Sequence, residues 1–330
     1  MRYGMAPRAP HQVSRGGCLP RVYNHFSMSL KPPSLLSPAS LTTTLDEAAA
    51  RPQSFAQLLI ERYQSTAYQP PLLADVAAGL LELSRRPFKP TEAVAFLERD
   101  AFLAGRVLQV AQSPVHSASG GVTSLAEAVT RLGHATLGPM FLAASMKLRV
   151  FRNREYLKPM AQLQAHSIAV AQLARLASRH TSLDPQVAYT CGLLHDVGLT
   201  AALVIYGDTE SLLGSATAAD APLGVKALWP SILPVHERAT DWLCGRWKLP
   251  ATMMEAVAHH HDLRLVQKPS PLAAVVSLAD GLASAIGFPA LDEVGSQQVA
   301  SALAVLGLTT AQHDALLRDA NRIQANIICR

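Results

Sequence analysis

The sequence predicts an all-helical protein built from two packed helical subdomains. Of its 330 residues, 49% are hydrophobic but only 5% are aromatic, and Ala and Leu are prominent. Few segments show the β-branched alternation that is typical of strands. Apolar side chains recur instead at the spacing of one helix face, as they do at Leu72, Val76, Leu80 and Leu83. A chain of this length can bury a sizeable core, so a globular all-α fold is expected.

Residues 1–45 are predicted to form a disordered basic tail. They are rich in Pro, Ser and basic residues and show no periodic hydrophobicity. Their Arg-rich, acid-free composition resembles a transit peptide, although it lacks the apolar core of a secretory signal. A third interpretation is that translation begins at Met28, which would leave the preceding residues outside the protein.

The net charge of +5 comes from this tail. Five of the 29 basic residues precede Asp46, the first acidic residue, and the other 24 equal the 24 acidic residues in number. The body is therefore neutral on average, which does not favour a basic groove for nucleic acid. A nucleic-acid role would rest on the tail alone.

The cysteine pattern favours reduced thiols and a cytoplasmic location. The four cysteines are scattered and form no Cys-x-x-Cys pair: Cys18, Cys191, Cys244 and Cys329. No uninterrupted apolar run reaches the length of a membrane span. The closest run, Pro271 to Phe288, is broken by Asp280, so no membrane association is expected.

The first helical subdomain is expected over residues 46–155. Its apolar stripe at 72–83 predicts a helix. Thr91 is placed to cap the following helix, and Asp100 is placed to cap the one after it, because both side chains can accept a hydrogen bond from a free backbone N–H.

Two further helices complete this subdomain. Ser124 and Glu127 have the spacing of a capping box, which predicts a helix from Leu125 to Leu132 that Gly133 terminates. Pro139 is expected to begin another apolar helix. This half of the chain contains no evident catalytic residue.

The second helical subdomain is expected over residues 156–330. Pro185, Pro250 and Pro271 lie near predicted helix starts, where the missing N–H costs nothing. Residues 207–224 are expected to form a loop. The helices are predicted at residues 159–179, 185–205, 231–247, 251–261, 271–286 and 311–327.

The chemistry of this chain centres on His195 and Asp196, which are expected to lie within a buried helix. An adjacent imidazole and carboxylate suit a divalent metal that accepts both nitrogen and oxygen ligands. Burying an ionised Asp196 without a partner is costly, and a metal ion would offset that cost. The alternative is that Asp196 accepts hydrogen bonds from imidazoles and only joins helices.

Asp280 interrupts another apolar helix and needs a partner for the same reason. The histidines on neighbouring predicted helices, taken singly, are explained as ordinary surface or core residues, and those that end the helix at 251–261 also suit its dipole. We nevertheless expect one cleft to collect both carboxylates and the histidines, with or without metal. The seven residues are His166, His195, Asp196, His236, His260, His261 and Asp280.

The order of these residues resembles the HD superfamily of metal-dependent phosphohydrolases, in particular its HDOD branch (HD-related output domain). The resemblance covers about residues 70–290. Three further segments carry it: Asp100 with Ala111-Gln112-Ser113; Thr123-Ser124, Ala128 and Leu132-Gly133; and Trp247-Lys248-Leu249-Pro250 followed by His260-His261. It implies an HD-like helical bundle, with a C-terminal helix, packed against the N-terminal helical subdomain.

The chain departs from the family pattern at several positions. Ala101 replaces a proline and Gln112 replaces an asparagine, changes that are expected to alter local turns only. Leu199 stands where many catalytic HD enzymes carry a lysine. The Gly-Tyr-Pro signature of the branch that cleaves cyclic-di-GMP is absent after His261. These losses favour a domain without catalysis.

The resemblance therefore implies a signal-transduction output module of a bacterial regulatory network, which acts on a protein partner and has no catalytic residues of its own. The alternative is a metal-dependent phosphohydrolase that acts on a nucleotide or cyclic dinucleotide. In that alternative, Asp196 bridges two divalent metal ions that activate a water molecule. One ion takes His166, His195 and Asp280, and the other takes mostly His236, His260 and His261.

Overall fold

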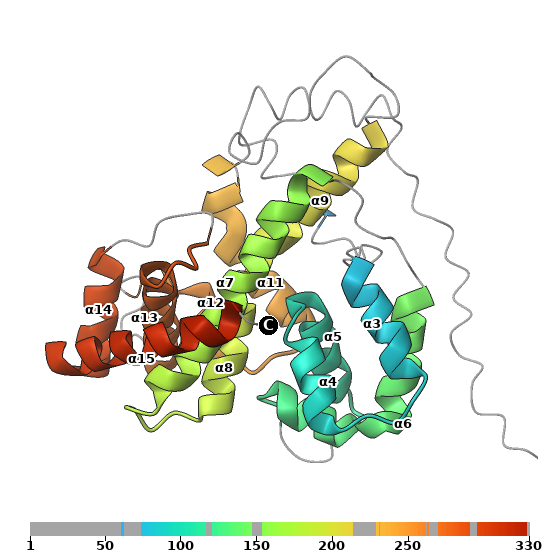
Figure 1. Ribbon diagram of the computed structural model, residues 1–330, viewed down its shortest axis with the longest axis horizontal. Helices are drawn as coiled ribbons and strands as arrows, with labels where there is room; N and C mark the ends of the chain where they lie inside the picture. The colour runs from blue at the N-terminus through green and yellow to red at the C-terminus, as the bar shows by residue number, and fades with distance from the viewer. Residues whose placement is uncertain are drawn as a thin grey trace, which may run out of the picture. The chain divides into compact units, whose positions relative to one another are not determined.

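Every regular element that the computed structural model describes is a helix, which confirms the all-α prediction (Figure 1). The predicted tail lies outside the described residues. The described residues are 61–62, 74–116, 121–146, 154–213, 229–230, 232–261, 263, 270–290 and 296–328.

The N-terminal helices pack around one long helix. The helices are α3 (Ala74–Ser84), α4 (Pro90–Leu97), α5 (Ala101–Ala111) and α6 (Leu125–Met146). Helix α6 contacts each of the other three. Their shared core consists of aliphatic side chains such as Leu80, Leu97 and Leu108, all fully buried. The helical periodicity in this half of the chain therefore places the apolar side chains in the interior.

The capping residues in this half are partly as predicted. Asp100 caps α5 by accepting a hydrogen bond from the Leu103 N–H at 2.9 Å. The expected cap at Thr91 is wrong, because α4 begins one residue earlier with Pro90, whose fixed φ favours the first helical position. Lys89 is the N-cap there and makes no side-chain bond.

The capping box at α6 is present in a shifted form. Ser124 Oγ accepts a hydrogen bond from the Glu127 N–H at 3.2 Å, while the Glu127 carboxylate accepts from the Thr123 N–H. Gly133 breaks the helix as expected, with φ of 61° and ψ of 178°. The helix then resumes at once, so Pro139 lies inside it and does not begin a new one.

In the C-terminal half, α7 and α13 pack against each other, and most of the other helices there contact one or both of them. Helix α14 is absent from the sequence prediction. Helix α9 continues through 207–213, so the predicted loop at 207–224 is wrong over these residues, and the rest of it lies outside the described residues. The elements are α7 (Arg154–Ser178), α8 (Pro185–Leu194), α9 (Val197–Leu213), the 3₁₀ turn η1 (Leu233–Val235), α11 (His236–Arg246), α12 (Ala251–Ala258), α13 (Pro271–Ala285), α14 (Ser296–Leu306) and α15 (Thr310–Ile328).

The two sets of helices meet at α5, α6 and α8. The Trp247 ring, at the end of α11, meets the Phe102 ring of α5 edge-on with centroids 6.2 Å apart. It also lies against Gly105, where an added Cβ would come within 2.4 Å of the ring. Gln109 donates to the Arg246 carbonyl oxygen at 2.7 Å. The division into subdomains at residue 155 stays a prediction.

One stretch of the described chain, Pro185–Gly207, has the length and apolar composition that could cross a membrane. It comprises α8 and most of α9, and 94% of its apolar window is buried inside the protein. A turn at His195 and Asp196 interrupts it. Burial of this kind is what core helices of a folded domain show.

Candidate metal centre

His195 and Asp196 lie at the junction of two helices, which corrects the expectation that they lie within one. Helix α8 ends at Leu194, and α9 begins at Val197. The apolar run continues through both helices, so the turn between them leaves no signal in the hydrophobic pattern. At this junction both residues are buried, with exposed fractions of 0% and 2%.

Two glycines on either side of the junction allow close helix contacts. A Cβ at Gly192 would lie 2.9 Å from the Val170 carbonyl oxygen of α7. A Cβ at Gly198 would lie 2.2 Å from the His236 carbonyl oxygen of α11. The Gly198 N–H also donates to Thr240 Oγ1 at 3.0 Å. The junction is thereby held between α7 and α11, which carry His166 and His236.

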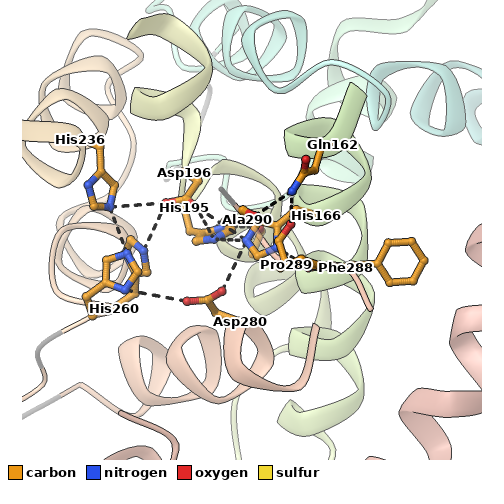
Figure 2. A network of polar contacts seen from close by, with 12 residues as sticks. Gln162, His166, His195, Asp196, His236, His260, Asp280, Phe288, Pro289 and Ala290 are labelled. Carbon is orange, nitrogen blue, oxygen red and sulfur yellow. Dashed lines mark hydrogen bonds and ion pairs between the residues drawn. The ribbon is translucent and has the colours of Figure 1, made fainter. Parts of the chain in front are cut away.

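His166 and His195, the inner pair, face each other through their Nε2 atoms at 3.2 Å. The Nδ1 atom of His166 lies 2.8 Å from the Phe288 carbonyl oxygen, and Nδ1 of His195 lies 2.8 Å from the Gly192 carbonyl oxygen. Gln162, one turn before His166 on α7, donates to the Ala290 carbonyl oxygen at 2.9 Å. Figure 2 shows how these bonds hold the segment after α13 against α7.

His236 and His261, the outer pair, have the same arrangement, with Nε2 atoms 3.0 Å apart. Nδ1 of His236 lies 2.6 Å from the Leu233 carbonyl oxygen. His260 directs its Nδ1 to the Val257 carbonyl oxygen at 2.7 Å. His259, His260 and His261 follow the last residue of α12, so the predicted helix end at 261 is three residues too late.

Asp196 lies between the two pairs. Its Oδ2 is 3.3 Å from Nε2 of His195 and 3.7 Å from Nε2 of His166. Its Oδ1 faces the other way, 3.4 Å from Nε2 of His260 and 3.7 Å from Nε2 of His236. The two oxygens of this carboxylate therefore face two different sets of imidazoles (Figure 2).

Asp280, on α13, lies beside one imidazole of each pair. Its Oδ1 lies 3.4 Å from Nε2 of His166, and its Oδ2 lies 3.9 Å from Nδ1 of His261. The structure thus brings all seven predicted residues together, from segments more than a hundred residues apart in sequence. Their role as metal ligands stays a prediction.

The facing Nε2 atoms need a cation or a proton between them. Since a carbonyl oxygen only accepts hydrogen bonds, each Nδ1 that faces one carries the proton, and the Nε2 of that neutral ring holds a lone pair. In the inner pair two such lone pairs face each other at 3.2 Å. A metal ion, or one additional proton, removes that repulsion.

Burial and charge separate the pKa values of these groups. Burial, with a contribution from the charge on His195, lowers the pKa of His166 to about 4, and burial lowers that of His260 to about 4. Burial lowers the pKa of His261 to about 3. Burial also opposes charge on His195, but neighbouring Asp196 outweighs it and raises the pKa of His195 to about 9. Asp196 itself is buried, yet His195 holds its pKa well below the usual range.

The donors fit one or two divalent metal ions. Donor atoms that all lie within 4.8 Å of one another occur in three groups. Two of them share Asp196, which lies with His166 and His195 in one and with His236, His260 and His261 in the other; the third consists of His195, His260 and Asp280. Among the described residues, Asp196 Oδ1 and His260 Nε2 are buried without a hydrogen-bond partner. Buried polar atoms in that state are costly, and coordination would satisfy both.

A pocket of about 440 Å³ opens onto the outer part of the cluster. Its volume lies in the range of small-molecule sites. Sequence reasoning missed Glu237 and Gln298 in its wall, because neither interrupts an apolar segment. The lining residues are Asp196, Leu199, Leu233, Pro234, His236, Glu237, His261, Asp280, Ala290 and Gln298.

Comparison with protein families gives one match over most of the helical body. The family model of the HDOD domain matches residues 71–263, more than half of the chain. Among curated proteins none matches. The matched range contains six of the seven cluster residues and ends before Asp280.

Several solved structures are similar to this one. The MmoQ response regulator from Methylococcus capsulatus str. Bath is 22% identical, with a TM-score of 0.57 over 76% of this chain and 98% of that chain. A virulence factor from Campylobacter jejuni subsp. jejuni is 14% identical, with a TM-score of 0.54 over 82% and 98%. An HDOD domain protein with unknown function from Geobacter sulfurreducens is 19% identical, with a TM-score of 0.40 over 86% and 96%. The first two likenesses support the fold.

Proposed function

This chain belongs to the HDOD domain family, and we propose that it is a signalling output module that binds divalent metal at the His/Asp cluster. In this proposal the module passes its state to a protein partner in the cytoplasm and does not turn over a substrate. The name of the similar MmoQ response regulator agrees with a regulatory role. The buried free thiols of Cys191 and Cys244 agree with a reducing compartment.

The observation that carries metal binding is the pair of imidazole contacts on either side of Asp196. Each contact sets two Nε2 atoms 3.0–3.2 Å apart, and three of these four rings donate Nδ1–H to a backbone carbonyl oxygen. Such carbonyl bonds fix the tautomer of metal-binding histidines in many proteins. The cluster therefore offers preorganised lone pairs around one shared carboxylate.

The pocket argues against catalytic turnover on a phosphate ester. The part of the pocket wall that the structure describes contains no Lys or Arg to hold a phosphate, whereas three carboxylates are present: Asp196, Glu237 and Asp280. Leu199 fills the position of the lysine expected in many catalytic HD enzymes and is buried, with an exposed fraction of 1%. Phosphoryl chemistry depends on such cationic clamps as well as on metal ions.

Elemental analysis of the purified protein tests whether the cluster binds divalent metal. Protein purified without chelators, and protein reconstituted with Zn²⁺, Mn²⁺ or Co²⁺, should contain bound metal, and Asp196→Ala should contain none. His180→Gln, at an exposed position of the described chain, serves as the matched control and should bind as wild type does. Wild-type protein that stays empty after reconstitution would contradict metal binding.

Native size-exclusion chromatography and crosslinking, with and without added metal, test the signalling role. We expect a specific complex whose stability depends on the metal. A strictly solitary protein with measurable hydrolysis would contradict an output role without turnover.

The second candidate function is metal-dependent hydrolysis of a nucleotide or cyclic dinucleotide. Its support is the sharing of Asp196 between two donor groups beside a pocket large enough for a small ligand. Divalent metals bound there would supply Lewis acidity and lower the pKa of a water molecule. A nucleotide panel incubated with metal-loaded protein decides between the two functions, with Asp196→Ala as the blank. Hydrolysis above the blank would favour the enzyme.

A further inference from the structure

Gln298, on α14, contacts the cluster although it is not one of the seven predicted residues. It lies 35 residues beyond the range that matches the HDOD domain. Its side chain is half-buried and reaches three groups: the His260 carbonyl oxygen, the Asp280 carboxylate and the His261 ring. The side chain therefore joins α13, α14 and the turn after α12.

The orientation of this amide follows from its neighbours. Gln298 Nε2 lies 3.1 Å from the His260 carbonyl oxygen and 3.2 Å from Asp280 Oδ2, and both of these oxygens accept hydrogen bonds. The amide nitrogen must point to them, which leaves Oε1 facing His261 Nδ1 at 3.4 Å. Because an amide oxygen only accepts, His261 donates Nδ1–H to it.

His261 thus differs from the other four imidazoles of the cluster in what holds its ring. Those four each direct Nδ1 to a backbone carbonyl oxygen: His166, His195, His236 and His260. For His261 the acceptor is the Gln298 side chain. With the proton on Nδ1, Nε2 of His261 presents its lone pair toward His236, as coordination requires.

We propose that Gln298 is a positioning residue that fixes His261 for metal coordination and couples occupancy of the cluster to the docking of α14. The inference rests on the metal binding proposed above. A coupling of this kind is reciprocal, so metal that binds better when α14 is docked must also strengthen the docking of α14. Helix α14 packs on α13, which carries Asp280, so both ends of the connection are helices of the bundle.

The first test is a Co²⁺ titration of the full chain, followed by calorimetry and by the visible absorption of the bound ion. Gln298→Leu removes the acceptor and should weaken Co²⁺ binding by about 10–100-fold, the usual cost of losing such a supporting contact. Gln298→Glu keeps an acceptor oxygen for His261 but loses the N–H that the His260 carbonyl oxygen and Asp280 accept, so it should weaken Co²⁺ binding less than Gln298→Leu does. Gln297→Leu changes the exposed neighbour on the same helix and should have no effect.

The second test is amide hydrogen exchange with and without Co²⁺. In wild type, the amides of α14 should gain protection when Co²⁺ binds, and in Gln298→Leu this gain should be lost. The remote helix α3 should respond in neither protein. Thermal unfolding of the metal-free variants checks that each is folded.

The outcomes separate this inference from the proposed function. Wild type that binds no Co²⁺ contradicts metal binding and the inference together. Wild type that binds Co²⁺ while Gln298→Leu binds it equally well overturns the role of Gln298 alone. Equal losses in Gln298→Glu and Gln298→Leu would overturn the acceptor assignment, and unchanged α14 protection in wild type would overturn the coupling.

Discussion

The inner and outer imidazole pairs lie on opposite sides of Asp196 and differ in what holds them. Both side chains of the inner pair are 0% exposed, and backbone carbonyl oxygens fix both rings. In the outer pair, His261 is 30% exposed and its ring is held by the Gln298 side chain, and both rings line the pocket. Folding therefore sets both rings of the inner pair directly, whereas in the outer pair the backbone holds His236 and a side-chain contact beside solvent holds His261.

Removing the shared carboxylate should disable both pairs at once, which is the largest effect expected. Asp196→Asn keeps the shape of the side chain but removes the charge that faces both pairs. We expect no bound metal above background by elemental analysis. The pKa of His195, raised to about 9 mainly by Asp196 against burial, should fall in this variant, as NMR titration would show.

Asp314→Asn is the matched control for that experiment, since Asp314 on α15 has a 58% exposed side chain. It should retain the metal content of wild type. Metal retained by Asp196→Asn would show that the two donor groups are independent of the shared carboxylate.

Separating α9 from α11 should displace the outer pair while leaving the inner pair in place. Gly198→Ala puts a Cβ within 2.2 Å of the His236 carbonyl oxygen, a backbone atom that cannot move freely. We expect a loss of about 3 kcal/mol in the free energy of unfolding, at the upper end for overpacking, together with weaker metal binding. Urea denaturation measures the loss in the free energy of unfolding.

Gly245→Ala provides the comparison, because its Cβ would meet only the flexible end of Met254 at 3.3 Å. An alanine at this position, in the last turn of α11, should be neutral or slightly stabilising. Equal destabilisation by the two variants would mean that the close contact at Gly198 has no special role.

Single histidine substitutions should distinguish the two pairs by stability more than by metal binding. His195→Gln leaves the buried Asp196 without its main partner and should cost about 1–3 kcal/mol in the metal-free protein. His261→Gln, at a partly exposed position, should cost less than about 1 kcal/mol. Both should weaken metal binding. Thermal unfolding in a chelator compares the two costs. A larger cost for His261→Gln would contradict the expectation that the buried inner pair contributes more to stability than the partly exposed outer pair.

The pH dependence of stability in the metal-free protein also separates the two pairs. The pKa values of His166 and His260 are about 4 when folded, below the ordinary 6.5, so their contribution to stability is present above pH 6.5 and lost as the pH falls toward 4. The pKa of His195 is about 9, so its contribution is present below pH 6.5 and lost as the pH rises through 9. The Tm should therefore peak near neutral pH and fall more steeply in acid.

His195→Gln should abolish the alkaline decline in Tm and make the acid decline smaller, because the charge on His195 helps to lower the pKa values of His166 and His260. Measurements in a chelator between pH about 4 and about 9 would show both limbs. An alkaline decline that persists in His195→Gln must come from another group.

The sequence allowed most of the helices, though not α14, and the clustering of the seven residues to be predicted, because apolar periodicity and buried charges leave a local signal. Apolar periodicity marks the helices, and Asp196 and Asp280 mark the site as charges in apolar surroundings that need partners. The turn at His195 leaves no such signal, since apolar residues continue across it. The sequence around Gln298 gives no signal either, because a glutamine on an amphipathic helix is common. Its contacts form only when tertiary packing brings it to residues 18 to 38 positions away in the chain.

The composition of the pocket wall has a consequence for the electric field at its mouth. With no metal bound, the described lining carries the carboxylates of Asp196, Glu237 and Asp280 and no Lys or Arg. Such a concave, low-dielectric surface focuses a negative potential, which attracts divalent cations and repels anions. Two bound divalent ions would outweigh three carboxylates and reverse the sign of that potential. Binding of an anionic ligand would then be ordered: the metal ions bind first, and the anion binds only to the metal-loaded pocket.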